Sequence, residues 1–313
     1  MDQFNVYKDM KARTNGEIYI GVVGPVRTGK STFIKRFMNL MVLPNIEDEN
    51  DRNRANDELP QSSSGKTIMT TEPKFVPNEA VSIKTEEGIE LNVRLIDCVG
   101  YMVEGATGHM EGEEERLVKT PWFDYEIPFT KAAAIGTKKV ITEHSTIGVV
   151  VTCDGSFGEI AAKQYEPAEE ETIKQLKALK KPFVVLLNTI HPYSESTKQL
   201  AAEKEEKYQT KVLPMNLEQM KKEDIYEIIK SVLMEFPISS IGFYVPRWTE
   251  MLKKDHPLKM ELLQMARDVI TEKTTMRDIY EEQEKEYEYI TGQKLESVAM
   301  DSGEVVITVK VGD

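Results

Sequence analysis

The sequence contains few of the residues that build disulfide frameworks and metal centres. Its 313 residues include two cysteines and four histidines. Both cysteines, Cys98 and Cys153, fall in apolar stretches, which is typical of core positions in a protein from a reducing compartment. The histidines occur singly and lack the spacing of metal ligands. The composition therefore argues against a secreted disulfide scaffold and against a histidine-based metal site.

Long apolar runs and an excess of positive charge are also missing. The longest apolar runs, Ile147–Cys153 and Phe183–Leu187, are far shorter than the roughly 20 residues of a membrane-spanning helix. The 40 basic residues are outnumbered by 53 acidic ones, which gives a net charge of −13 at pH 7. This charge disfavours binding to nucleic-acid phosphates and to bare anionic lipid. With no signal peptide and Asp2 in place of a myristoylation glycine, we expect a cytoplasmic protein with no membrane span and no nucleic-acid partner.

The first three quarters of the chain alternate between strand and helix patterns. From Glu17 to Asn188, short β-branched runs are followed by amphipathic helical patterns, which predicts an α/β fold with a mostly parallel sheet. Strands at 81–85 and 89–96 are close enough in sequence to form one antiparallel hairpin. The polar stretch 47–64 is interpreted as a long loop, and the stretch 101–128 as an insertion or lid.

The pattern changes after Pro237. Helices are expected at 249–265 and 278–288, followed by a strand at 304–310. We therefore expect one complete domain over residues 1–237 and the truncated beginning of a second, α+β domain over residues 238–313.

A glycine-rich motif follows the first predicted strand. Residues 24–31 read Gly-Pro-Val-Arg-Thr-Gly-Lys-Ser and match the P-loop pattern G-x-x-x-x-G-K-[ST], with a strand before it and an amphipathic helix after it. In such a loop the backbone N–H groups surround the β-phosphate, Lys30 spans the β- and γ-phosphates, and the Ser31 hydroxyl binds Mg²⁺. The predicted nucleotide-binding residues are Gly24, Pro25, Val26, Arg27, Thr28, Gly29, Lys30, Ser31 and Thr32.

A second acidic motif completes the predicted site. Asp97 ends a strand and begins the D-x-x-G pattern 97–100, so it is the candidate Walker B residue that holds Mg²⁺ through water, while the Gly100 amide contacts the γ-phosphate. Thr70 and Thr71 lie between the two motifs, where a threonine is expected to sense the metal and the γ-phosphate; the alternative is that they simply enter the strand near 74–76. The predicted catalytic residues are Lys30, Thr70, Thr71 and Asp97, and the predicted metal ligands are Ser31, Thr71 and Asp97.

Two positions differ from the pattern of small GTPases. The residue after D-x-x-G is Tyr101, where many GTPases place the glutamine that orients water. We therefore expect slow hydrolysis, with the missing group supplied by the insertion, by a potassium ion or by another subunit. The guanine-reading N-K-x-D motif is replaced by Asn188-Thr-Ile-His191, which lacks the aspartate. Asn188 can still support the P-loop, but ATP is favoured over GTP because the guanine donors lose their acceptor.

These motifs together resemble one known family. The stretches Gly24–Lys35, Asp57–Gln61, Gly65–Pro77, Asp97–Tyr101, Glu143–Val150 and Asn188–Pro192 are similar to those of the stage IV sporulation protein A family, the spore-coat morphogenetic ATPases of endospore-forming bacteria. The resemblance implies a TRAFAC-class P-loop NTPase whose ATP hydrolysis is coupled to self-assembly into a homopolymer. It also implies attachment to the outer forespore membrane surface, on the mother-cell side, through a small amphipathic membrane-anchoring protein, and contact with other coat morphogenetic proteins.

The family's functional residues match this sequence position by position. Its Walker A lysine corresponds to Lys30, its Walker B aspartate to Asp97, and its sensor threonines to Thr70 and Thr71. Two alternatives remain open at this stage: a switch GTPase, and a nucleotide-binding structural module without turnover.

The missing aspartate leads to a test of nucleotide choice. Excess ATP is expected to displace labelled GTP, and excess GTP is expected to displace labelled ATP poorly, because a site without a partner for a buried donor discriminates against the ligand that carries it. A filter-binding competition assay measures both directions. The reverse order of displacement would contradict the assignment of ATP.

Overall fold

The computed structural model describes residues 16–60, 72–84, 90–112, 114–280, 285–299 and 302–312. Within these ranges the chain forms two compact units, which hold the described residues from 16 to 232 and from 233 to 312. Each unit has its own sheet and its own buried residues.

A six-stranded sheet is the centre of the first unit. Its order is β10-β9-β8-β1-β3-β2, in which β2 runs antiparallel to β3 and the other neighbours are parallel. Every residue of β8 and β9 is buried, which explains their continuous apolar runs, because helices cover both faces of such strands. The predicted mostly parallel sheet and its antiparallel hairpin are confirmed. The strands are β1 (Glu17–Val23), β2 (Lys74–Lys84), β3 (Glu90–Asp97), β8 (Ile147–Cys153), β9 (Phe183–Asn188) and β10 (Val212–Met215).

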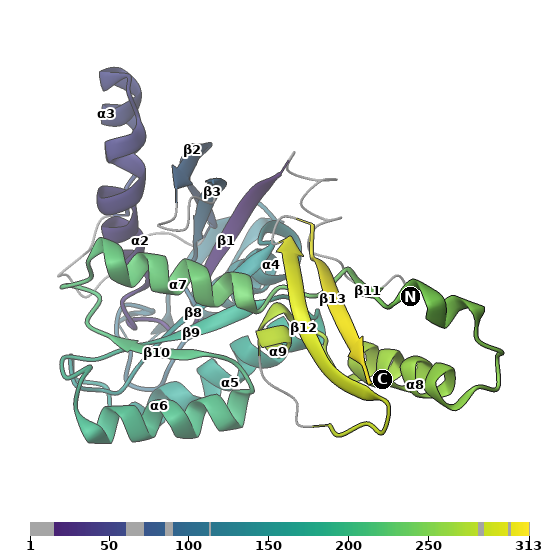
Figure 1. Ribbon diagram of the computed structural model, residues 1–313. Coiled ribbons are helices and arrows are strands. Elements are labelled where there is room, and N and C mark those ends of the chain that lie inside the picture. Colours follow the sequence, from purple (N-terminus) through teal and green to yellow (C-terminus); the bar gives the residue numbers. More distant parts are fainter. Residues whose placement is uncertain are drawn as a thin grey trace. The chain divides into compact units, whose positions relative to one another are not determined.

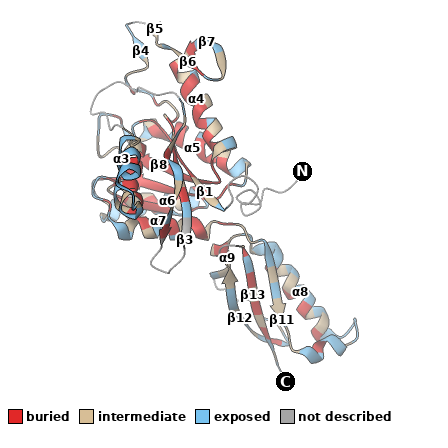
Figure 2. Ribbon diagram, turned by 90° about the horizontal axis from the view of Figure 1, so that it is seen from above, coloured by how far each residue is buried: buried red, intermediate tan, exposed pale blue. Residues whose placement is uncertain are grey.

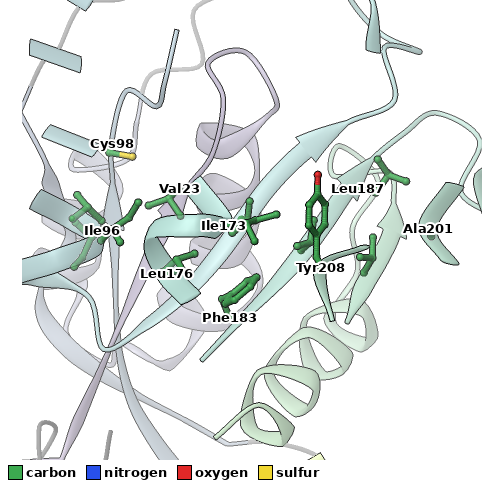
Figure 3. Close-up of a cluster of buried hydrophobic side chains, with 14 residues drawn as sticks. Val23, Ile96, Cys98, Ile173, Leu176, Phe183, Leu187, Ala201 and Tyr208 are labelled. Atoms are coloured by element: carbon green, nitrogen blue, oxygen red, sulfur yellow. The ribbon is translucent and has the colours of Figure 1, made fainter. Parts of the chain in front are cut away.

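Helices cover this sheet on both sides. In Figure 1, α5 and α6 lie on one side of β8, β9 and β10, and α7 lies on the other. Buried side chains from β8, β9, α5 and α6 form one of the hydrophobic clusters, which is drawn in Figure 3 and includes Val150, Ile173, Leu176, Leu187 and Tyr208. The helices are α2 (Lys30–Phe37), α4 (Phe129–Lys139), α5 (Ala162–Ala178), α6 (Glu195–Tyr208) and α7 (Lys222–Met234); π-helical turns extend α2 over Met38–Val42 and α4 over Val140–His144, and a 3₁₀ turn follows at Leu43–Asn45.

The stretch interpreted as a long loop contains a helix, so that interpretation is wrong for α3 (Glu49–Asp57). Asp48 begins this helix by accepting two backbone N–H groups of the first turn at 2.8 and 3.0 Å. Ala55 is its one buried residue, and Figure 2 shows α3 as largely exposed. A helix with one buried residue has no hydrophobic periodicity, so only the cap could have revealed it. Residues 61–64 lie outside the described part.

The segment 101–128 contains two short antiparallel pairs, β4 with β5 and β6 with β7. Its last strand leads directly into α4. The strands are β4 (Met110–Glu111), β5 (Glu114–Glu115), β6 (Leu117–Thr120) and β7 (Phe123–Pro128).

The second unit is built around a three-stranded sheet of order β11-β13-β12, with β11 parallel and β12 antiparallel to β13. Its core consists of apolar residues of α8 and β13, including Leu258, Leu262, Met265, Val269, Val305, Ile307 and Val309. The elements are β11 (Ser240–Tyr244), a 3₁₀ turn (Arg247–Met251), α8 (Pro257–Glu272), α9 (Met276–Tyr280), β12 (Ile290–Ala299) and β13 (Glu304–Val311).

Two expectations for this part of the chain are corrected, and two strands were missed. The helix expected at 249–265 begins at Pro257, because proline suits a first helical position, and continues to Glu272. The helix expected at 278–288 is wrong over 285–288, which are not helical, while 281–284 lie outside the described residues. The strands β11 and β12 were not predicted, since both are edge strands in which most residues are exposed or half-buried. None of the described helices is long and apolar enough to cross a membrane.

A buried ion pair links α5 to α6 beneath β8. Lys204 Nζ lies 2.6 Å from Glu169 Oε1, and the two side chains are 11% and 1% exposed. Thr152 Oγ1 on β8 donates to the other oxygen of Glu169 at 2.5 Å. Neighbouring Lys207 and Glu170 form a similar pair at 2.5 Å that is about half exposed, at 49% and 51%.

The two pairs give a matched test of burial. Replacing Lys204→Met leaves Glu169 as a buried charge without its cation, so the free energy of unfolding is expected to fall by about 3 kcal/mol. Lys207→Met removes an exposed pair and is expected to lower it by less than about 1 kcal/mol. Urea unfolding measures both. Equal losses of unfolding free energy in the two variants would show that the burial of Glu169 does not determine how much its ion pair stabilises the fold.

Candidate nucleotide site

The glycine-rich motif forms the loop between β1 and α2. Gly24 and Gly29 have left-handed backbone angles, with φ of 127° and 99°. A Cβ atom at Gly24 would lie 2.4 Å from the carbonyl oxygen of Val151, and one at Gly29 would lie 2.5 Å from Asn188 Nδ2. Both positions therefore require glycine for the backbone angle and for the space. Arg27 also has a positive φ, of 60°, and its side chain donates to the Thr107 side chain at 3.2 Å.

Lys30 is the buried cation of this loop. It is 5% exposed, and its Nζ donates to the carbonyl oxygens of Pro25 at 2.5 Å and Gly24 at 3.5 Å. Thr28 Oγ1 donates to the same Pro25 oxygen at 3.0 Å. Burial lowers the pKa of Lys30, against the opposing effect of the nearby Cys98 and Asp97. An anion bound at this ammonium would favour its charged form.

Asp97 ends β3 next to β1, where it is in register with Val22. Its Oδ1 is buried and has no hydrogen-bond partner within the described residues. Burial raises the pKa of Asp97 to about 6, although nearby Lys30 opposes this shift. An orphaned carboxylate oxygen beside a phosphate-binding loop suits a divalent cation or its bound water.

The described residues fit Mg²⁺ and not a protein-only metal centre. No group of three or more His, Cys, Asp and Glu side chains that could hold a metal occurs in the described ranges. Mg²⁺ ordinarily takes one or two protein oxygens and completes its shell with phosphates and water. Ser31, in the first turn of α2, and Asp97 are the described side chains that could supply those oxygens.

The D-x-x-G segment lies against the P-loop. Tyr101 N donates to the Gly24 carbonyl at 3.2 Å, and Val26 N donates to the Tyr101 carbonyl at 2.9 Å. Gly100 has a φ of 97°, and a Cβ there would lie 2.5 Å from Lys30 Nζ. The Gly100 N–H, predicted to contact a γ-phosphate, donates to Thr137 Oγ1 at 3.1 Å. The Tyr101 hydroxyl donates to Gln175 Oε1 at 2.7 Å, which directs this side chain to α5.

Asn188, at the end of β9, connects two loops. Its Nδ2 donates to the Thr28 carbonyl of the P-loop at 3.0 Å, and its Oδ1 accepts the Leu217 N–H at 3.2 Å. The following Thr189 donates to Asp154 at 2.6 Å, whereas His191 is exposed. The described contact of Asn188 is therefore with the loop backbone.

The structure brings most of the predicted residues to the carboxyl ends of β1, β3 and β9. These are Gly24, Pro25, Val26, Arg27, Thr28, Gly29, Lys30, Ser31, Thr32, Asp97, Gly100 and Asn188. Thr70 and Thr71 lie outside the described residues, so their roles stay predictions. Sequence reasoning missed Thr137, which contacts Gly100 across 37 residues and has no motif around it.

A parallel sheet with a glycine-rich loop between β1 and α2, and an acidic residue on the adjacent β3, defines the P-loop nucleotide-binding class. Comparison with known proteins gives the family. Residues 1–237 match the family model described as stage IV sporulation protein A, ATPase domain, and residues 238–313 match the model for its middle domain. The chain belongs to the stage IV sporulation protein A family.

Three curated relatives agree with this assignment, and each is named stage IV sporulation protein A. The relative from Clostridioides difficile (strain 630) is 54% identical over 275 residues, which cover 88% of this chain and 56% of that protein. Those from Bacillus anthracis and Bacillus subtilis (strain 168) are 47% and 46% identical over 305 residues, or 97% of this chain and 62% of each relative. The chain therefore spans about three fifths of the length of these relatives.

The raised pKa of Asp97 predicts a pH dependence of metal binding. A metal ligand has to be ionised, and a carboxyl with a pKa of about 6 is mostly protonated at pH 5 and mostly ionised at pH 7. Apparent Mg²⁺ affinity in the presence of nucleotide is therefore expected to fall about tenfold more between pH 7 and pH 5 in the wild type than in Asp97→Asn. Calorimetric Mg²⁺ titrations measure this difference. The same pH dependence in both proteins would contradict a role for Asp97.

Proposed function

We propose that the chain binds and hydrolyses ATP with Mg²⁺, and that this hydrolysis drives self-assembly of a spore-coat layer on the forespore surface. The observation that carries the proposal is the pairing of two buried groups at the carboxyl ends of adjacent strands: the Lys30 ammonium, and Asp97 Oδ1, which has no hydrogen-bond partner among the described residues. A P-loop lysine and a Walker B aspartate have this arrangement. The match of residues 1–237 to the family's ATPase domain supports the same activity.

We assign the site to the TRAFAC class, its domain to residues 1–237 and a middle domain to residues 238–313. The antiparallel position of β2 at the edge beside β3, in an otherwise parallel sheet, supports a GTPase-derived topology.

Each residue of the site has a defined task in this mechanism. The backbone N–H groups of the P-loop bind the β-phosphate, and Lys30 exchanges its carbonyl partners for the β- and γ-phosphate oxygens. Ser31 and Asp97 would hold Mg²⁺, and the ion would supply positive charge against the charge that develops on the phosphates. Thr70 and Thr71 are proposed to sense the metal and the γ-phosphate.

The residues that would contact the nucleotide base and the attacking water differ from those of a switch GTPase. Asn188 is engaged with the P-loop and His191 is exposed, so neither provides the paired acceptor that guanine needs. Tyr101 donates its hydroxyl to Gln175 and cannot orient water as a glutamine does. These two contacts support ATP as the substrate and slow turnover by the isolated chain.

We further propose that the protein acts in the mother-cell cytoplasm, at the outer forespore membrane, as a homopolymer. With a charge of −13, the chain would be repelled by anionic lipid, so a small amphipathic membrane-anchoring protein is the expected adaptor. Other coat morphogenetic proteins are the expected partners, in keeping with the family.

A nucleotide-binding module without turnover is the second candidate function, favoured by the hydrogen bond of Tyr101 to Gln175.

Turnover measured at rising protein concentration tests this proposal. Wild-type ATP hydrolysis per chain is expected to increase with concentration, because another subunit is one possible source of the missing catalytic group. Lys30→Ala is expected to abolish ATP binding, since the buried phosphate partner is lost. Lys35→Ala, on the exposed side of the same helix, is expected to bind and hydrolyse as the wild type does.

The outcomes separate the candidates. Normal ATP binding by Lys30→Ala would show that the site assignment is wrong, and ATP binding without turnover at any concentration would favour the structural module. A rate per chain that is the same in dilute and concentrated protein would remove the contribution of a second subunit. The double variant Thr70→Ala/Thr71→Ala is expected to bind ATP and to hydrolyse it poorly.

A further inference from the structure

Gly100 and Thr137 form a buried contact between the D-x-x-G segment and α4. The Gly100 N–H donates to Thr137 Oγ1 at 3.1 Å, and Thr137 is 0% exposed. The hydroxyl hydrogen of Thr137 is itself donated to the Ala133 carbonyl at 2.8 Å. Because a threonine hydroxyl has one hydrogen and two lone pairs, its oxygen acts as the acceptor for Gly100. The direction of this hydrogen bond is therefore defined.

The same glycine lies against the cation of the phosphate site. A Cβ at Gly100 would lie 2.3 Å from the Gly24 carbonyl oxygen and 2.5 Å from Lys30 Nζ. The next residue, Tyr101, is held to the P-loop by two backbone hydrogen bonds. A phosphate group bound by Lys30 would therefore arrive beside Gly100, whose N–H is directed to α4.

A γ-phosphate and Thr137 would compete for this one N–H group. An ionised phosphate oxygen is a stronger acceptor than a hydroxyl. Building on the ATP site proposed above, we propose that Thr137 is a positioning residue: it holds the Gly100 N–H in the nucleotide-free and ADP-bound chain and loses it to the γ-phosphate of ATP. ADP has no γ-phosphate and leaves the Gly100–Thr137 bond in place.

This exchange connects the phosphate site, through α4, to the β5 part of the 101–128 segment. Thr137 lies in the last turn of α4, and α4 begins at Phe129, directly after β7 of the 101–128 segment. Thr130, in the first turn of α4, donates its backbone N–H to Glu115 of β5 at 2.8 Å. In this proposal, the hydrogen bond from Gly100 to the last turn of α4 is present with ADP and lost with ATP. The first turn of the same helix is bonded to the 101–128 segment.

Three variants isolate the hydroxyl oxygen of Thr137. Thr137→Val removes the acceptor and keeps the side-chain shape, whereas Thr137→Ser keeps the oxygen. Thr172→Val is the matched control, because Thr172 is also 0% exposed and donates to a carbonyl four residues earlier, that of Ala168, at 2.7 Å within α5. Thr172→Val loses the same kind of hydrogen bond, from a threonine hydroxyl to a helix carbonyl, at a place away from Gly100.

Two measurements on the 313-residue chain report on the hydrogen bond between Gly100 and Thr137. Amide hydrogen exchange at Gly100 is measured without nucleotide, and the Kd values of ADP and of β,γ-imido-ATP are measured by calorimetry with Mg²⁺. Thr137→Val is expected to exchange Gly100 about tenfold faster and to raise the ratio of the ADP Kd to the analogue Kd about tenfold. The reason is that loss of the hydroxyl acceptor of a buried donor destabilises only the states that lack the γ-phosphate. Thr137→Ser and Thr172→Val are expected to match the wild type.

The wild type alone provides a further readout that needs no variant to fold. Its Gly100 amide resonance is expected to shift with the ATP analogue and to remain in place with ADP, and equal shifts would overturn the inference. An unchanged Kd ratio in Thr137→Val, or the same change in Thr172→Val, would overturn it while leaving the ATP site intact. A wild type that binds neither nucleotide would overturn both this inference and the proposed function.

Discussion

The buried ammonium of Lys30 is the interaction on which the rest of the site depends. It lies at the first residue of α2, satisfied by carbonyl oxygens of its own loop and close enough to Asp97 for each charge to affect the pKa of the other. Burial lowers the pKa of Lys30 and raises that of Asp97. The protein alone therefore stabilises the charged form of each group less well than water does. A bound phosphate and a bound cation would supply the missing counter-charges.

The backbone around this cation is constrained in consequence. Gly100 approaches so closely that a side chain would collide with the Lys30 ammonium, and Gly29 leaves no room for one beside Asn188. Asn188 in turn fixes the P-loop to the loop after β10 through Leu217. The site is therefore held by contacts between strand ends, and the proposed nucleotide-dependent change involves the Gly100 N–H, which bonds to Thr137 when no γ-phosphate is present.

The sequence predicted what depends on local pattern. The P-loop could be located because its glycines, lysine and serine have fixed spacing between a strand and a helix, and the parallel sheet could be predicted because buried strands such as β8 consist mostly of apolar residues. Family membership, expected from the resemblance, is confirmed by the family models and the curated relatives. The roles of the individual site residues stay predictions.

Features that depend on tertiary contacts or exposed surfaces could not be predicted in this way. Helix α3 buries one residue and is set by the Asp48 cap, and β12 is an edge strand with few buried side chains. In the sequence, Thr137 cannot be distinguished from other buried helical threonines, because its contact with Gly100 exists only in the folded chain. No periodicity along the chain records a contact between two segments so far apart in sequence.

The titration of Lys30 tests the central claim most directly. In a chain carrying ¹⁵N-labelled lysine, with the Lys30 resonance assigned through Lys30→Arg, the account predicts a pKa below that of the surface lysines without nucleotide. It predicts a rise in that pKa when ATP and Mg²⁺ are added, because the phosphates stabilise the charged ammonium. A Lys30 resonance that titrates with the surface lysines in both states would contradict the account.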